Sequence, residues 1–149
     1  MSPSRRSRVR ACATYAIKAE VSDPNASSWT FDAQKTMYGG KLVSKGDQIF
    51  VFASENDGGC GLIAKGVVSQ AEATPKRQDL ERQTPRVTIT VNRTGRPNRR
   101  LGRGELTPYD QWSDGRPETE LNFKFYRQAT NKIVGLSQDA TEFLLSFFS

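Results

Sequence analysis

The chain has 149 residues, with 36% hydrophobic and 26% charged side chains, a composition that suits one domain with a compact core. No run of about 18 apolar residues occurs, which excludes a membrane-spanning helix. Histidine is absent, which excludes the Ser-His and Cys-His catalytic pairs and histidine-based metal sites. The formal charge of +6 favours a polyanionic partner.

The N-terminal ten residues carry four arginines and no acid, and we expect them to form a disordered basic arm before a single domain at 11–149. No apolar stretch follows these arginines, so they do not form a secretory signal. Cys12 and Cys60 are too few for a disulfide framework, which favours a reducing cytoplasm as the location.

Alternating apolar and polar residues, together with short apolar runs, predict a series of short strands. In chain order they cover residues 12–21, 49–53, 61–71, 86–91 and 122–128, followed by an apolar piece at 133–136. The strand at 49–53 is apolar throughout, so we expect it to be buried on both faces. Gly66 indicates a bulge in the strand that follows it.

Two short helices are predicted beside these strands. The first begins at a serine at 27–28, carries Trp29 and ends at the glycine pair 39–40. Ser137 caps the second, at the end of the chain. Between them, residues 92–120 are rich in glycine and proline, and so long a segment is usually functional or disordered.

Hairpins and loops, rather than regular crossover helices, join the predicted strands. This pattern excludes a doubly wound parallel sheet. It predicts an α+β fold, namely a small mixed or antiparallel β-barrel with short peripheral helices.

The loop after the buried strand is the most distinctive stretch of the chain. Ser54, Glu55 and Asn56 supply hydroxyl, carboxylate and amide groups, and the glycines that follow leave the backbone open. A buried strand that ends in a polar, glycine-rich loop is one way in which small domains form a ligand pocket. A plain hairpin connection is the alternative interpretation of this loop.

An enzyme is a second interpretation, in which Glu55, Asp57 and Lys65 serve a Mg²⁺-dependent nuclease or RNA-processing enzyme. Their spacing matches no nuclease pattern, and glycine-rich loops also carry acids for turn geometry alone. Residues 59–64 fit the dinucleotide pattern G-x-G-x-x-A, but a strand follows instead of the required helix. We therefore expect no catalytic residue, no metal and no cofactor.

Arginine is clustered between residues 86 and 103, where six arginines occur without an acid. Arginine binds phosphate with two parallel hydrogen bonds and stacks on bases, so the cluster favours nucleic acid as the partner. Phosphate contacts are expected at four of these residues, namely Arg93, Arg96, Arg99 and Arg100. Docking of the arginines on an acidic protein or ribosomal surface is a third interpretation.

The order of elements over 11–148 is specific enough to compare with known families. A tryptophan-bearing segment follows the first strand, a Lys-Gly-Asp turn at 45–47 leads to the apolar strand, and Phe-Lys-Phe-Tyr-Arg at 123–127 precedes the last helix. This order resembles the PUA-like superfamily and, within it, the EVE domain most closely. Two departures are a first strand without the usual EVE signature and the basic insertion at 86–103.

The resemblance implies a pseudo-barrel that binds RNA or reads a modified base of DNA or RNA in a pocket beside the barrel. Carried over by position, the pocket residues are Trp29, Tyr38, Phe52, Ser54, Glu55 and Asn56. The two residues from the first helical segment would stack on the base, and the polar ones would read its edge. The sequence thus predicts a non-catalytic nucleic-acid-binding module that recognises a modified or flipped base.

Overall fold

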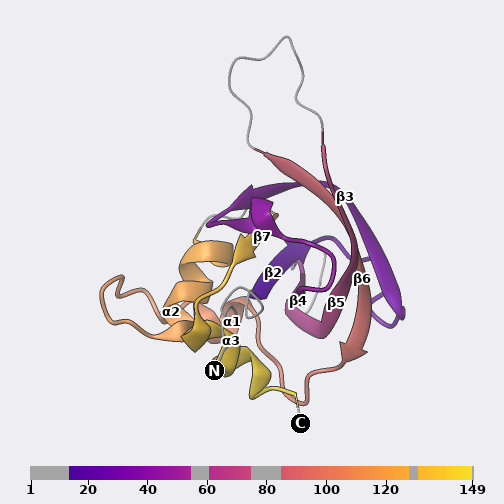
Figure 1. Ribbon diagram of the computed structural model, residues 1–149. Helices are drawn as coiled ribbons and strands as arrows, with labels where there is room; N and C mark the ends of the chain where they lie inside the picture. The colour runs from indigo at the N-terminus through magenta and orange to yellow at the C-terminus, as the bar shows by residue number, and fades with distance from the viewer. Residues whose placement is uncertain (1–13, 55–60, 75–84, 128–130, 149) are drawn as a thin grey trace, which may run out of the picture.

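The computed structural model describes residues 14–54, 61–74, 85–127 and 131–148. Figure 1 shows a closed barrel with short helices gathered on one side. The strands are β2 (Thr14–Ala19), β3 (Ser28–Met37), β4 (Gln48–Ala53), β5 (Gly61–Ala73), β6 (Arg86–Gly95) and β7 (Lys132–Gly135). The helices are η2 (Gly40–Leu42), α1 (Arg103–Leu106), α2 (Pro117–Leu121), η3 (Asn122–Tyr126) and α3 (Gln138–Leu145). The expected basic arm at 1–10 lies outside the described residues.

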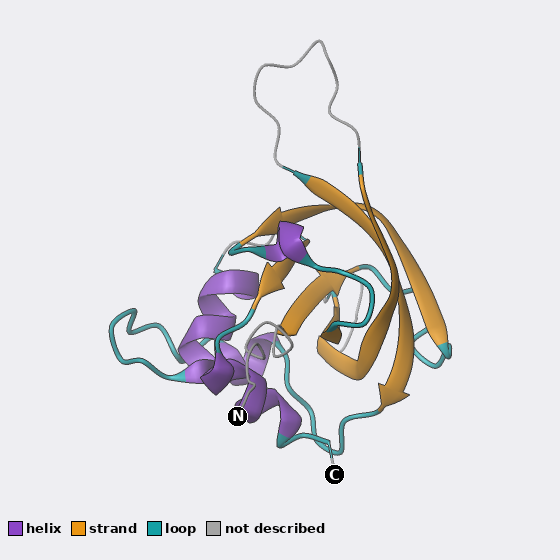
Figure 2. Ribbon diagram, in the orientation of Figure 1, coloured by secondary structure: helices purple, strands orange, loops and turns teal. Residues whose placement is uncertain are grey.

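Around the barrel the strands follow the order β2-β4-β5-β6-β3-β7. β2 pairs in parallel with β4 and antiparallel with β7, and β7 pairs in parallel with β3. The other neighbours are antiparallel. Figure 2 shows most of the helical turns packed together outside one side of the barrel, and the short helix η2 lies apart from them in the connection between β3 and β4. The prediction of a small mixed barrel with peripheral helices is confirmed.

The alternation of side chains along β4 explains why the domain has two cores. Ile49 and Val51 point into the barrel interior, whereas Phe50 and Phe52 point outward into a second cluster that the helices cover. The ring of Phe52 packs against Phe125 of η3, with the ring centroids 5.0 Å apart. The prediction that this strand is buried on both faces is confirmed.

The helix predicted to begin at 27–28 is wrong, because this segment is strand β3. Trp29 and Phe31 are buried and the residues between and beside them are exposed, which is the two-residue period of a strand. A helix would turn these two rings to nearly opposite faces. In the strand they share the barrel interior, and the Nε1 of Trp29 donates to the carbonyl oxygen of Asp23 at 2.9 Å.

The strand predicted at 122–128 is also wrong, because this part of the chain continues from α2 into the π-helical segment η3. Pro117 occupies the first turn of α2, where its missing N–H has no helical partner to lose. Leu121 and Phe125 are four residues apart and fully buried. Helical spacing, rather than the alternation of Phe123 and Phe125, therefore decides which side chains enter the core.

The helix predicted after Ser137 is confirmed as α3. The Ser137 hydroxyl accepts a hydrogen bond from the amide of Ala140 at 3.1 Å, and so caps the first turn. Leu144 and Phe147 then bury their side chains in the outer cluster. In the part of the chain that the structure describes, no helix is long and apolar enough to cross a membrane.

Phe125→Ala is expected to lower the free energy of unfolding by about 3–5 kcal/mol, because it leaves a cavity between η3 and β4. Phe123→Ala is the matched control, since Phe123 is only half-buried and should lose clearly less. Urea unfolding followed by circular dichroism measures both variants. Equal losses would contradict the assignment of Phe125, and not Phe123, to the outer core.

Candidate functional site

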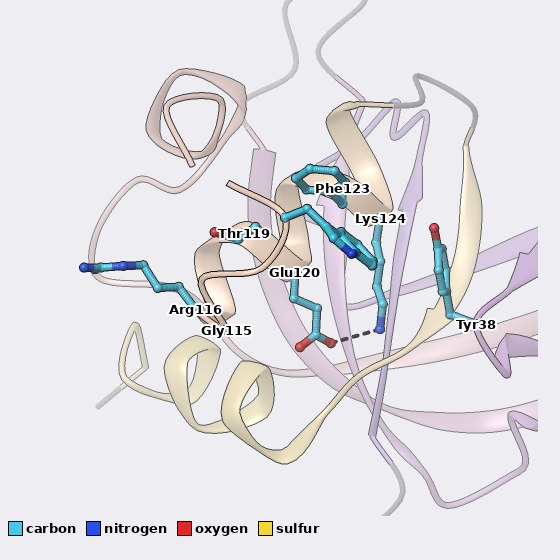
Figure 3. Close-up of a pocket in the computed structure, with 8 residues that line it drawn as sticks. Tyr38, Gly115, Arg116, Thr119, Glu120, Phe123 and Lys124 are labelled. Atoms are coloured by element: carbon cyan, nitrogen blue, oxygen red, sulfur yellow. Dashed lines mark hydrogen bonds and ion pairs between the residues drawn. The ribbon is translucent and has the colours of Figure 1, made fainter. Parts of the chain in front are cut away.

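A pocket of about 270 Å³ opens on the outer side of the barrel, where the end of β3 faces α2 and η3. It is lined by Tyr38, Trp112, Gly115, Arg116, Thr119, Glu120, Phe123 and Lys124. Figure 3 shows the side chains of Glu120 and Lys124 extending from the helices to meet each other, with Tyr38 on the opposite side of Lys124. The helical residues reach the same pocket because residues three to five apart share a helix face.

Tyr38 has an unusual backbone. Its φ is 53°, in the left-handed region that residues other than glycine, asparagine and aspartate rarely adopt. Its carbonyl oxygen accepts from the amide of Gly135 at 3.0 Å, and a Cβ on Gly135 would lie only 2.6 Å from that oxygen. This close contact with β7 holds the turn, and the Tyr38 ring remains 48% exposed at the pocket. Backbone strain of this kind is often found at functional sites.

The second wall of the pocket is also aromatic. Trp112, from the loop between α1 and α2, lies with its ring centroid 5.0 Å from that of Phe123 and the two planes at 54°. The indole is nevertheless 73% exposed. An exposed tryptophan held against another ring offers a large apolar surface to a planar ligand.

An ion pair forms the polar floor of the pocket. The ammonium of Lys124 lies 2.9 Å from Glu120 Oε2, donates to the Gly135 carbonyl oxygen at 2.7 Å and lies 5.0 Å from the centroid of the Tyr38 ring. The Glu120 carboxylate also accepts from the amide of Ser137 at 2.9 Å and from the Ser137 hydroxyl. These groups join α2, η3, β7 and the start of α3.

Glu120 is ionised at neutral pH. Burial raises the pKa of its carboxyl, but the hydrogen bonds from Ser137 and from Lys124 outweigh burial and hold the pKa below its usual value. The floor therefore presents a carboxylate whose oxygens act only as acceptors.

Of the six pocket residues predicted from the sequence, the structure places Tyr38 at this pocket. Trp29 lies in the barrel interior with 9% exposure, and Phe52 is fully buried in the outer core. Ser54 is buried at the end of β4, where its amide donates to the Ala19 carbonyl oxygen at 2.8 Å. The other two predicted residues, Glu55 and Asn56, lie outside the described residues.

The sequence prediction of the site did not include the other residues that line the pocket, among them Glu120, Phe123 and Lys124. The assignment of 122–128 to a strand concealed Phe123 and Lys124, and Glu120 lay at the end of the segment 92–120, where no helix was predicted. Glu120 and Lys124 are four residues apart and follow a proline that can begin a helix. This pattern could have identified them from the sequence.

The four predicted phosphate-binding arginines lie on β6 and the segment that follows it, and each makes a contact within the domain. Arg93 and Arg96 donate to the backbone and side-chain oxygens of Asn25, at 2.9 and 3.0 Å. Arg99 donates to the Ser146 hydroxyl at 3.1 Å, beyond the end of α3. Arg100 forms an exposed ion pair with Glu105, at 3.6 Å. Arg93 is half-buried, and the other three are exposed.

Of the three residues in the nuclease interpretation, the structure describes Lys65. Lys65 lies on β5 with its Nζ 5.5 Å from the ring centroid of Phe148, and Glu55 and Asp57 lie outside the described residues. Within the described ranges, no three His, Cys, Asp or Glu side chains gather to hold a metal ion.

Two lysines are buried on the barrel wall, and the sequence analysis did not single them out. Lys18 of β2 and Lys132 of β7 are register partners with exposures of 2% and 0%. The Lys18 ammonium donates to the Phe125 carbonyl oxygen at 2.9 Å and lies 5.3 Å from the centroid of the Tyr126 ring. Burial, and secondly the charge of Lys18, lower the pKa of Lys132 to about 8.

Comparison with known proteins gives matches in structure but not in sequence: no family model and no curated protein matches the chain. Human thymocyte nuclear protein 1, solved in complex with 5-methylcytosine-containing DNA, is 18% identical with a TM-score of 0.62, covering 90% of this chain and 96% of that chain. The DUF55 domain of the same human protein is 16% identical with a TM-score of 0.62, covering 89% and 96%. The chain has a PUA-like fold of the EVE type.

The EVE-type fold predicted from the order of elements is thus confirmed. The same fold also matches an ASCH protein of Zymomonas mobilis, which is 13% identical with a TM-score of 0.50 over 91% of this chain and 99% of that chain. At these identities the likeness concerns the fold, and the function of the chain has to be argued from its own pocket.

The buried Lys132 predicts a pH dependence of stability. Its pKa in the folded protein is about 8, below the usual 10.5. Between these two pH values the unfolded chain binds more protons than the folded protein, so the free energy of unfolding rises with pH. The free energy of unfolding of the wild type, minus that of Lys132→Met, should therefore rise by roughly 3 kcal/mol from pH 7 to pH 10.5.

Urea unfolding of the wild type and the variant at both pH values measures this difference. Lys41→Met is the control, because Lys41 is exposed on η2. A difference between wild type and Lys132→Met that stays constant with pH would contradict the burial of a titrating amine.

Proposed function

We propose that this domain binds nucleic acid and holds a modified or flipped base in the pocket between Tyr38, Trp112 and Phe123. The observation that carries the proposal is the pair of aromatic walls above an ionised carboxylate. Stacking on aromatic side chains is worth about 1–3 kcal/mol per base, and polar groups at the end of the pocket can read the base edge.

The size and place of the pocket support a single base as the ligand. Its 270 Å³ lies just below the range of about 300–1,000 Å³ that is usual for drug-sized ligands. The pocket lies outside the barrel, so a base inside a duplex would have to leave the stack to enter it. A protein with this fold was solved with DNA that contains 5-methylcytosine, which supports a base of this kind as the ligand.

The arginines beyond the end of β6 provide the phosphate contacts in this proposal. Helix α3 links the two regions, because Ser137 at its start binds Glu120 and Ser146 at its end binds Arg99. Nine residues of helical rise separate these two serines by roughly 14 Å. A strand with its base in the pocket would thus reach the arginines with phosphates a few nucleotides away.

A binding role without catalysis fits the described residues best. Two of the three side chains in the nuclease interpretation, Glu55 and Asp57, lie outside the described residues, whereas the described pocket pairs aromatic walls with a carboxylate, an arrangement suited to holding a base. We therefore develop no catalytic step.

Removal of either aromatic wall should weaken binding of an oligonucleotide with one modified base. Trp112→Ala and Tyr38→Asn are each expected to raise Kd roughly 5- to 150-fold through lost stacking. Asparagine is chosen at 38 because it tolerates the left-handed backbone. Fluorescence anisotropy measures Kd, with thermal unfolding as a folding check.

Val67→Ala is the matched control, because Val67 is an exposed apolar residue of β5 outside the pocket. This variant should bind as the wild type does. If Trp112→Ala and Tyr38→Asn also keep the wild-type Kd while folded, the pocket is not the binding site and the proposal is wrong.

The arginines should contribute affinity without selectivity. Arg96→Gln and Arg100→Gln are each expected to reduce the slope of log K against log salt concentration by about 0.7–0.9, and to weaken modified and unmodified oligonucleotides equally. Arg86→Gln, at the opposite end of β6, is the control and should leave the slope unchanged. If Arg96→Gln and Arg100→Gln leave the slope unchanged as the control does, these two arginines do not contact phosphates.

A further inference from the structure

The hydrogen-bond partners of the pocket floor restrict the chemistry of the base, an inference that rests on the proposed function. A lysine ammonium has three N–H donors. That of Lys124 is directed to Glu120 Oε2 at 2.9 Å, to the carbonyl oxygen of Gly135 at 2.7 Å and to the face of the Tyr38 ring. The cation at the floor is therefore occupied by contacts within the protein.

Glu120 has acceptor capacity left. An ionised carboxylate offers about four lone-pair positions. Oε2 accepts from Lys124 and from the Ser137 amide, whereas Oε1 accepts from the Ser137 hydroxyl alone. The side chain lines the pocket and is 20% exposed, so the acceptor capacity left on the carboxylate can serve a ligand.

Thr119, beside Glu120 in the lining, does not offer its hydroxyl hydrogen to a ligand. Its hydroxyl donates to Asp114 Oδ2 at 2.9 Å. Hydrogen bonds from the Arg116 amide and the Thr119 hydroxyl lower the pKa of Asp114, so Asp114 is a carboxylate and the Thr119 hydroxyl must be the donor of this pair. The hydrogen of the Thr119 hydroxyl is thus used within the protein. Figure 3 shows the Arg116 side chain extending away from Glu120 and Lys124.

We propose that the pocket selects a base with an exocyclic amino group, which donates to the Glu120 carboxylate. Cytosine and adenine carry such donors at N4 and N6, whereas thymine and uracil carry a carbonyl oxygen at C4. A carbonyl oxygen against the carboxylate gains no hydrogen bond and is repelled, and contacts of this kind give specificity by rejecting the wrong ligand.

The test uses single-stranded oligonucleotides that are identical except at one base, so that no base pair has to open. One pair compares 5-methylcytosine with thymine, and the other compares cytosine with uracil. Within each pair the bases differ in the amino or oxo group at C4 and in the protonation of N3. The wild type should bind the amino-bearing member roughly 5- to 150-fold more tightly in both pairs.

Glu120→Gln should bring this ratio close to one, because the amide of glutamine can donate to a carbonyl oxygen at C4. Glu118→Gln on the same helix is the matched control and should keep the wild-type ratio. Thermal unfolding shows whether each variant is folded. The wild-type ratios need no variant, so the proposal can be overturned even if Glu120→Gln does not fold.

The outcomes separate this inference from the proposed function. Equal binding of both members of each pair, with binding still weakened in Trp112→Ala, overturns the amino-group selection and leaves the pocket as the binding site. Binding that is unaffected by Trp112→Ala and Tyr38→Asn overturns both proposals. A wild-type preference for the amino base that persists in folded Glu120→Gln overturns the role of Glu120.

Discussion

The ion pair between Glu120 and Lys124 is the interaction on which the site depends. Exposed ion pairs contribute little to stability, because water and salt screen them. Here both side chains are largely buried, and their further partners are backbone groups of β7 and α3. The pair therefore fixes the positions of α2, η3, β7 and the start of α3 relative to each other, and η3 carries Phe123 of the aromatic walls.

The barrel supplies a rigid support for this arrangement. Apolar side chains fill its interior from every strand, and a second cluster lies between the strands and the helices. Because both faces of β4 are buried, the helices cannot shift along the barrel without losing contacts such as that of Phe52 with Phe125. The pocket opens at the edge of this covered face, where side chains from the helices and from the end of β3 meet solvent.

The sequence predicted the elements whose pattern is local. β4 is apolar throughout, β6 alternates, and Ser137 is a typical helix cap, so each could be identified without the rest of the chain. The errors fall at Trp29 and Phe123, where an apolar residue recurs after two positions in a short segment. Such a segment fits either a strand or a helix turn, and only pairing with distant partners decides between them.

The candidate site was predictable only in part for the same reason. Tyr38 was expected at the pocket, but its partners come from residues more than seventy positions later in the chain. The Glu-Lys spacing on α2 and η3 is a local signal, whereas the exposure of Trp112 is a property of the folded loop. No pattern in the sequence reports how far that loop leaves the indole in water.

Strand β7 closes the barrel through few residue pairs. It has only four residues, yet it joins β2 on one side and β3 on the other, and two residue pairs make the contact with β3. Local opening of a domain begins where the fewest bonds have to break. At the end of this strand, the Gly135 carbonyl oxygen accepts from Lys124 and the Gly135 amide donates to Tyr38. Separation of β7 from β3 would therefore also break these contacts of the pocket floor. A ligand that binds in the pocket only while the barrel is closed would therefore stabilise the closed barrel against local opening.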